Sequence, residues 1–177
     1  MAEWIDRISR ATGRVAAWLT LALVLVTVTV VVMRYAFDAG YIWMQELVVW
    51  LHAVVFMLGA AYTLLHDEHV RVDVFYREMT PRRRALVDLA GTLLLLLPLA
   101  AFIFIYSWEY VAGSWQIREG SRQARGLPFP AMSLMKSLLL AMPVLIALQG
   151  IAIALRAVAV LRGGAAETAT HDDRQGL

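Results

Sequence analysis

The stretch VAAWLTLALVLVTVTVVVM occupies residues 15–33 and contains nineteen residues without a single Asp, Glu, Lys or Arg. At a rise of about 1.5 Å per residue, a helix of this length crosses the roughly 30 Å hydrocarbon core of a bilayer. Three further uncharged runs of similar length follow at residues 47–65, 89–108 and 137–155. Helices are the only open structures that satisfy their own backbone hydrogen bonds in lipid. The sequence therefore predicts an all-α, polytopic membrane protein with four transmembrane helices.

The composition leaves little material for a soluble domain. The 177 residues are 60% hydrophobic and 17% charged, whereas soluble domains contain about 25% charged residues. The segments between the runs are shorter than the roughly 40–50 residues that a separate domain needs. The first run is longer than the roughly 7–15 apolar residues of a signal-peptide core, so we expect it to remain as a permanent helix. We expect one transmembrane domain over residues 1–162, with spans near 15–33, 44–65, 86–108 and 133–155, and a disordered cytoplasmic tail at 163–177.

The distribution of Lys and Arg predicts the orientation of the spans. If both termini are cytoplasmic, eleven of the sixteen basic residues lie inside and five lie outside, in agreement with the positive-inside rule. Trp43 then lies at the outer headgroup level, where aromatic side chains are enriched. The basic residues flank the spans instead of forming one stripe, so we expect membrane lipid as a partner and no nucleic acid.

The N-terminal residues 1–14 have two interpretations. Trp4, Ile5 and Ile8 have helical spacing beside charged neighbours, a pattern typical of a short amphipathic helix that lies on the inner leaflet. The same residues also fit a plain extension of the first span.

Carboxylates, lysines and arginines are absent from the middle of the predicted spans. Arg34, Glu46 and Lys136 all lie within a turn or two of the outer interface, where a long side chain reaches the headgroups at lower cost. A transporter or channel usually needs a polar path at mid-depth, built from carboxylates, broken helices or carbonyls. We therefore expect this chain not to move a solute alone.

Histidine and cysteine usage limits the cofactors that the chain can hold. His52 is the sole histidine inside a predicted span, so bis-histidine haem ligation cannot be built from the spans of one chain. We expect His52 to be buried and hydrogen-bonded. The run His66-Asp67-Glu68-His69 has metal-ligand residue types, but it follows the second span in a hydrophilic loop. With no cysteine and no catalytic set of residues, we expect no cofactor, no metal and no enzyme activity.

Several short motifs occur in an order that is specific to one family. They are RYAF at residues 34–37, WMQEL at 43–47 and HVRVD at 69–73, followed by Ser114, Glu119, Ser121, GLP at 126–128, Lys136 and Pro143. On these motifs the chain resembles, over residues 11–162, the small membrane subunit of tripartite ATP-independent periplasmic (TRAP) transporters. The resemblance implies a multi-pass protein of the bacterial inner membrane.

The resemblance also implies a three-part uptake system. In such a system a periplasmic binding protein captures an organic acid, and a large membrane subunit moves it together with sodium. The small subunit binds neither substrate nor sodium; it scaffolds the large subunit and offers part of the docking surface for the binding protein. The structural and partner-contact residues that we expect are Arg34, Trp43, Glu46, His69, Arg71, Asp73, Arg118, Arg122, Arg125 and Lys136.

This hypothesis predicts one ion pair and one partner-binding surface, and it has two alternatives. We expect Arg34 to pair with Glu46 near the outer interface, and the basic residues between 118 and 125 to be available to a periplasmic partner. One alternative is a stand-alone small exporter that acts as a homo-oligomer. Such exporters place a carboxylate within the first span, and this first span has none. A cytochrome-like anchor is the other alternative, and it predicts a haem absorbance band.

Overall fold

The computed structural model describes residues 2–66 and 79–175, with side chains between residues 3 and 163. All of its regular elements are helices, and four segments are long and apolar enough to cross a membrane, which confirms the predicted fold class. The predicted contact residues His69, Arg71 and Asp73 lie outside the described residues. The elements are α1 (Ala2–Ala36), α2 (Ile42–Leu65), α4 (Pro81–Gly91), the π-helical turn η1 (Thr92–Leu96), α5 (Leu97–Gln116) and α6 (Ala131–Gln175).

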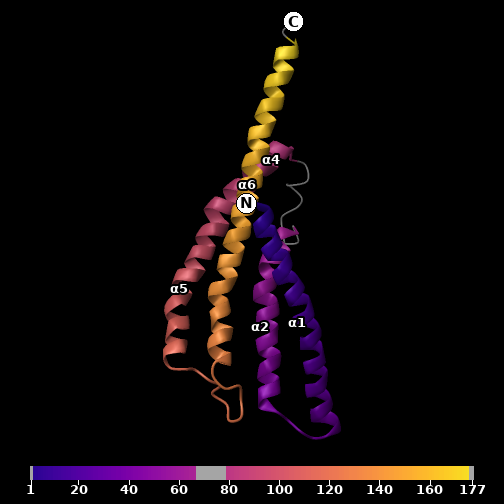
Figure 1. Ribbon diagram of the computed structural model, residues 1–177, viewed down its shortest axis with the longest axis vertical. Coiled ribbons are helices and arrows are strands. Elements are labelled where there is room, and N and C mark those ends of the chain that lie inside the picture. The colour runs from indigo at the N-terminus through magenta and orange to yellow at the C-terminus, as the bar shows by residue number, and fades with distance from the viewer. Residues whose placement is uncertain (1, 67–78, 176–177) are drawn as a thin grey trace.

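The central element of the bundle is α6, which packs against α1, α2, α4 and α5, whereas α1 also packs on α2. Figure 1 shows α1 and α5 at opposite edges of the bundle, with α2 and α6 between them. The third span combines α4, η1 and α5 and runs from Pro81 to Gln116. The arrangement is open, and the two edge helices turn most of their apolar side chains outward.

Both termini lie at one end of the bundle, and the connections 37–41 and 117–130 lie at the other (Figure 1). This arrangement agrees with the prediction that both termini share one side. The positive-inside rule places that side in the cytoplasm. We call the end with the termini the inner end and the opposite end the outer end.

The N-terminal residues continue α1 without a break, so a separate interfacial helix does not form and the extension of the first span is the correct interpretation. The cause is packing against α6. Ser9 is 2% exposed, and its hydroxyl donates a hydrogen bond to Gln149 Oε1 at 2.9 Å. Ile5, one turn earlier, is also buried. These contacts keep the first turns in line with the bundle instead of on the leaflet surface.

At Gly13 the backbone of α1 lies directly against the ring of Tyr62 on α2. A Cβ atom at this position would lie 2.1 Å from Tyr62 Cδ2 and 2.4 Å from Tyr62 Cγ. The tyrosine ring therefore occupies the space that any side chain at Gly13 would need. The same ring packs on His66 at a centroid distance of 4.2 Å. A small residue at position 13 thus sets the distance between the two helices, as is common in membranes.

The third span changes its helical pitch near its middle. In η1 the Leu97 N–H donates to Thr92 O, the spacing of a π-helix. Pro98 follows directly and lacks the N–H that an α-helix would use, and a local π turn accommodates that missing donor. The widened turn packs on α6 at Gly150, where a Cβ atom would lie 2.5 Å from Leu96 Cδ2.

In the structure α6 continues as a helix through residue 163 to Gln175, and the disorder expected of the tail at 163–177 stays a prediction. Two properties favour this continuation of the helix. The fourth span already provides the helix nucleus, so each added residue requires only propagation. The segment also contains Ala165, Ala166 and Ala169, and alanine has the highest helix propensity. In Figure 1 this part of α6 projects beyond the bundle at the inner end.

Candidate functional site

The connection between α5 and α6, residues 117–130, forms a compact structure that we call the outer loop. Its backbone closes on itself, since the Ser121 N–H donates to Leu127 O at 2.9 Å and the Gly126 N–H donates to Gln123 O at 3.1 Å. The Gln123 N–H also donates to Ser121 Oγ at 3.0 Å. These bonds give the outer loop a defined shape of its own.

Glu46, in the second turn of α2, holds the outer loop from the side. One carboxylate oxygen accepts a hydrogen bond from the Ser121 hydroxyl, and the other accepts one from the Leu127 N–H at 2.6 Å. A Cβ atom at Gly126 would lie 2.6 Å from the Glu46 carboxylate and 2.2 Å from Ser121 Oγ. Only glycine therefore lets the loop approach the carboxylate this closely. Hydrogen bonds to a charged acceptor are stronger than neutral ones, so Glu46 is the main link between α2 and the outer loop.

The expected ion pair between Arg34 and Glu46 does not form in the part of the chain that the structure describes. Arg34 lies in the last turn of α1 and is exposed, a position where a basic side chain interacts favourably with the helix dipole. Glu46 turns instead toward the outer loop, because a hydroxyl and a backbone N–H there satisfy both of its oxygens.

A second polar contact at the outer end joins α5, the outer loop and α6. Lys136 Nζ lies 2.5 Å from Glu119 Oε2 and 4.1 Å from the centre of the Tyr110 ring. The hydrogen bond from Lys136, followed by one from Ser114, lowers the pKa of the Glu119 carboxyl below its usual value of 4.5. The pair therefore fastens the start of the outer loop to α6, while Glu46 fastens the loop to α2.

Acid is expected to weaken the outer end through Glu119. A carboxyl whose pKa is lowered by folding stabilises the folded state above its unfolded pKa, and this contribution is lost as the pH falls through the folded pKa. We expect the difference in thermal unfolding midpoint between the protein and its Glu119→Gln variant to stay constant between about pH 7 and pH 5.5 and to shrink below about pH 4.5. A difference that persists unchanged near about pH 3 would contradict this assignment.

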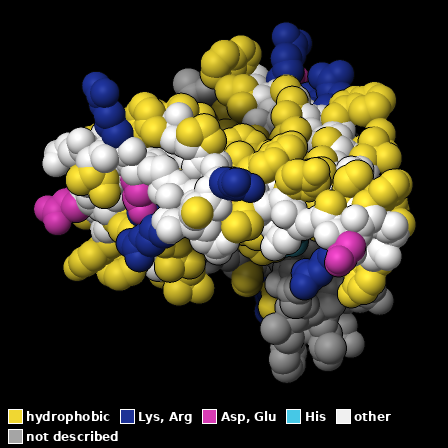
Figure 2. Space-filling view, turned by 90° about the horizontal axis from the view of Figure 1, so that it is seen from below, with side chains coloured by type: hydrophobic (Ala, Val, Ile, Leu, Met, Phe, Trp, Pro, Cys, Tyr) yellow, Lys and Arg dark blue, Asp and Glu magenta, His cyan; other side chains and the backbone are white. Residues whose placement is uncertain are grey.

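The three arginines of the outer loop, Arg118, Arg122 and Arg125, are exposed. Two of them have left-handed backbone conformations, with φ of 49° at Arg118 and 65° at Arg125. Trp43, at the start of α2 on the same end, is 43% exposed. Figure 2 looks onto this end and shows separate basic side chains among hydrophobic ones. All four residues are accessible to a molecule outside the membrane.

A polar cluster at the inner end connects α1 to α6. Gln149 is 0% exposed, and its Nε2 lies 3.3 Å from Asp6 Oδ1 while its Oε1 accepts the hydrogen bond from Ser9. Arg156 Nη1 lies 3.1 and 2.9 Å from the two oxygens of Asp6. The sequence alone predicted no partner for any of these side chains. The available signal was a glutamine within an apolar run, since a buried amide needs hydrogen-bond partners.

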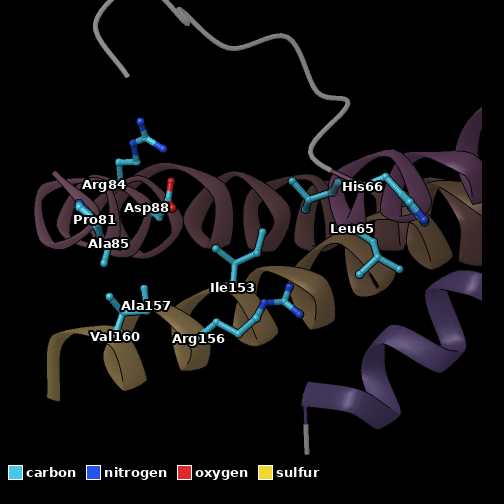
Figure 3. A pocket seen from close by; sticks show the side chains of 11 residues that line it. Leu65, His66, Pro81, Arg84, Ala85, Asp88, Ile153, Arg156, Ala157 and Val160 are labelled. Carbon is cyan, nitrogen blue, oxygen red and sulfur yellow. The ribbon is translucent and has the colours of Figure 1, made fainter. Parts of the chain in front are cut away.

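A cavity of about 470 Å³ lies beside this cluster, between the inner end of α2, α4 and α6. Figure 3 shows Arg84, Asp88, His66 and Arg156 around it, together with apolar side chains of α6. His66 Nδ1 lies 3.1 Å from Tyr62 O, so the ring also contacts the last turn of α2. The arginine-rich first turn of α4 borders the cavity, so the cavity lies at the depth of the cytoplasmic headgroups.

His52 differs from the expectation of a buried side chain, because it is exposed on α2. The hydropathy of a span does not reveal which side of the helix faces the other spans. The packing of α2 against α1 and α6 decides this, and it places a different set of α2 residues in the core: Leu51, Val54, Ala61 and Leu64.

Motifs that are far apart in the sequence thus meet at the outer end, and the same sequence matches a known family. Residues 5–160 match the family model of tripartite ATP-independent periplasmic transporters, DctQ component. The chain belongs to this family. It is a small subunit of a TRAP transporter and a multi-pass protein of the bacterial inner membrane.

A curated relative of this TRAP subunit is the C4-dicarboxylate TRAP transporter small permease protein DctQ of Vibrio cholerae serotype O1. The two are 28% identical over 112 residues, which cover 61% of this chain and 48% of the relative. The chain therefore spans about half the length of the relative that it matches. No solved structure matches the chain.

Several of the residues that carried the TRAP resemblance meet at the outer end of the bundle. The WMQEL motif supplies Glu46, and the GLP motif supplies the Leu127 N–H that Glu46 binds. Glu119 and Lys136, which the sequence did not pair, form the second contact of the set. The polar cluster of α1 and α6 lies at the inner end, apart from these two contacts.

Proposed function

We propose that this TRAP subunit does not carry the solute itself and instead scaffolds the large membrane subunit. In this proposal the large subunit binds sodium and moves an organic acid, which a periplasmic binding protein delivers. The proposal assigns no catalytic step, cofactor or metal to this chain. The name of the Vibrio cholerae relative refers to C4-dicarboxylates, which are organic acids, and this supports the proposed substrate class.

The observation that supports a scaffold is that charged side chains in the spans bind other groups of this same chain. Glu46 and Lys136 bind the outer loop, while Asp6 and Arg156 bind each other between α1 and α6. A transported anion needs polar groups and helix ends near the bilayer midplane that are available to bind it. Side chains that are already bonded near the two ends of the bundle fix helix positions instead.

The outer loop supports a docking role toward the periplasmic binding protein. Its shape is held by Glu46 and by the pair of Glu119 with Lys136, so its exposed arginines are presented by a fixed loop. A binding protein with an acidic rim would be attracted to them. Contacts of this kind act mainly on the association rate and weaken with salt.

Reconstitution in liposomes tests the proposal. A large TRAP subunit from the same organism is reconstituted with this chain or without it, and uptake of a radiolabelled C4-dicarboxylate is measured with the binding protein and a sodium gradient. We expect uptake only when all three proteins are present. Control liposomes contain this chain alone and receive the same substrate.

Two results would overturn the scaffold proposal. Uptake at an unchanged rate without this chain would show that it is dispensable. Solute movement in liposomes that contain this chain alone would favour the homo-oligomeric exporter instead.

A further inference from the structure

One stripe of α2 faces away from the rest of the bundle. It consists of Gln45, Val49, His52 and Phe56, which follow one another at spacings of four, three and four residues, and all four are exposed. We call this stripe the α2 membrane face. Val49 is 61% exposed and Phe56 is 68% exposed, so no other described part of the chain covers the stripe.

His52 places a polar group at mid-depth on this face. It lies ten residues after Ile42, the start of α2, and therefore about 15 Å along a bilayer core of roughly 30 Å. Its ring stacks on Phe56 at 6.4 Å. The imidazole has one donor and one acceptor nitrogen when neutral, and neither is bonded within the described residues. Polar groups left unsatisfied in lipid are costly.

At similar depth, the exposed faces of the two edge helices carry mainly apolar side chains and no histidine. On α1 the exposed side chains include Val24, Leu25 and Val28, and the hydroxyl of Thr27 donates to its own helix at Leu23 O. On α5 they include Leu99, Phe102 and Ile105. Such surfaces need nothing beyond acyl chains.

We propose that a transmembrane helix of the large TRAP subunit packs on the α2 membrane face and exchanges a hydrogen bond with His52. This inference rests on the proposed function. The position of the face favours the large subunit as the occupant. Its outer end at Gln45 adjoins Glu46, which holds the outer loop, so a large subunit placed there lies beside the surface proposed to receive the binding protein. A delivered solute then reaches the translocating subunit directly.

Cysteine crosslinking tests this placement. This chain contains no cysteine, so each introduced thiol is the single one in this chain. Val49→Cys and Phe56→Cys probe the α2 membrane face, and Val28→Cys and Phe102→Cys are matched controls on α1 and α5. Each variant is labelled in membranes with a thiol-reactive benzophenone in the presence of the large TRAP subunit. After illumination we expect the variants at positions 49 and 56 to give an adduct with the combined mass of this chain and the large subunit. We expect no such adduct from the two control variants.

The His52→Leu variant tests the hydrogen bond itself. Interhelical hydrogen bonds in membranes contribute about 0.6–1.7 kcal/mol, so recovery of the large subunit by the tagged chain in mild detergent is expected to fall about 3- to 20-fold. His52→Asn retains a donor and an acceptor and is expected to recover part of the binding. Phe102→Leu, on α5, is the control and should not change recovery.

The outcomes separate this inference from the proposed function. Adducts between two copies of this chain, or adducts with the large subunit only from positions 28 or 102, would overturn the placement while the scaffold proposal stands. A His52→Leu variant that recovers the large subunit fully would remove the hydrogen bond from the inference. Failure of the native chain to recover the large subunit at all would overturn both.

Discussion

The Glu46→Ala variant is expected to release the outer loop from α2 and to speed amide hydrogen exchange at Leu127. The Leu127 N–H donates to the Glu46 carboxylate at 2.6 Å, and the Ser121 hydroxyl donates to the other oxygen. Hydrogen bonds to charged groups contribute about 1.5–3 kcal/mol, which corresponds to exchange about 10- to 150-fold faster. Exchange measured by mass spectrometry on the purified protein in detergent reports this directly.

Two variants control this experiment. Glu46→Gln keeps an acceptor oxygen for the Leu127 N–H but removes the charge, so its exchange rate should lie between those of the native protein and Glu46→Ala. Glu109→Ala removes an exposed carboxylate of α5 near the same end and should leave the Leu127 amide unchanged. Equal protection of Leu127 in the native protein and in Glu46→Ala would show that Glu46 does not hold the loop.

Release of the outer loop has a consequence for the proposed function. The same loop carries Arg118, Arg122 and Arg125, which the proposal places opposite the binding protein. In the reconstituted three-part system, Glu46→Ala is therefore expected to reduce uptake mainly at low concentrations of binding protein. Saturating amounts of the binding protein should recover most of the rate, because the translocating subunit itself is unchanged.

The Gly13→Ala variant is expected to destabilise the bundle by about 1–3 kcal/mol, the usual cost of overpacking. The added Cβ atom would lie 2.1–2.7 Å from three atoms of the Tyr62 ring. The ring cannot yield easily, since the contact includes its Cγ atom and the ring also packs on His66. Either α1 must move away from α2 or Tyr62 must change its rotamer. Thermal unfolding of the purified variant in detergent measures the loss.

A second glycine provides a control in which replacement by alanine is expected to raise stability. A Cβ atom at Gly59, inside α2, meets nothing within 4 Å. Replacement of a helical glycine by alanine without a clash stabilises by about 0.5–1 kcal/mol. Gly59→Ala should therefore raise the unfolding midpoint, whereas Gly13→Ala lowers it. A midpoint that rises in both variants would mean that Tyr62 does not fill the space at Gly13.

Several features of this protein were predictable because they depend on local sequence. The four spans follow from uncharged runs long enough to cross a bilayer, and the shared side of the two termini follows from an even number of spans. The small-subunit family was also predictable, since its motifs are contiguous groups of residues such as WMQEL. Each of these properties can be read without knowing which helix touches which.

The polar contacts were harder to predict, as the two ends of the bundle show. Arg34 and Glu46 are near neighbours in sequence and share the outer interface, yet Glu46 binds a loop 75 to 81 residues away. Ser9 and Gln149 are 140 residues apart, and no local pattern connects them. The partner of a polar side chain depends on the rotation of each helix about its axis, and many rotations satisfy the same hydropathy.

Sequence alone therefore determined the number of spans, their orientation and the family, because hydropathy, charge and short motifs are properties of contiguous residues. The tertiary structure decided which side chains meet: Glu46 with the outer loop, Glu119 with Lys136, and Gln149 with the first turns of α1. It also decided that His52 faces outward. The physical reason is that an apolar side chain has a similar free energy against lipid and against another helix. Only the packing of whole helices therefore selects which face of each helix is buried.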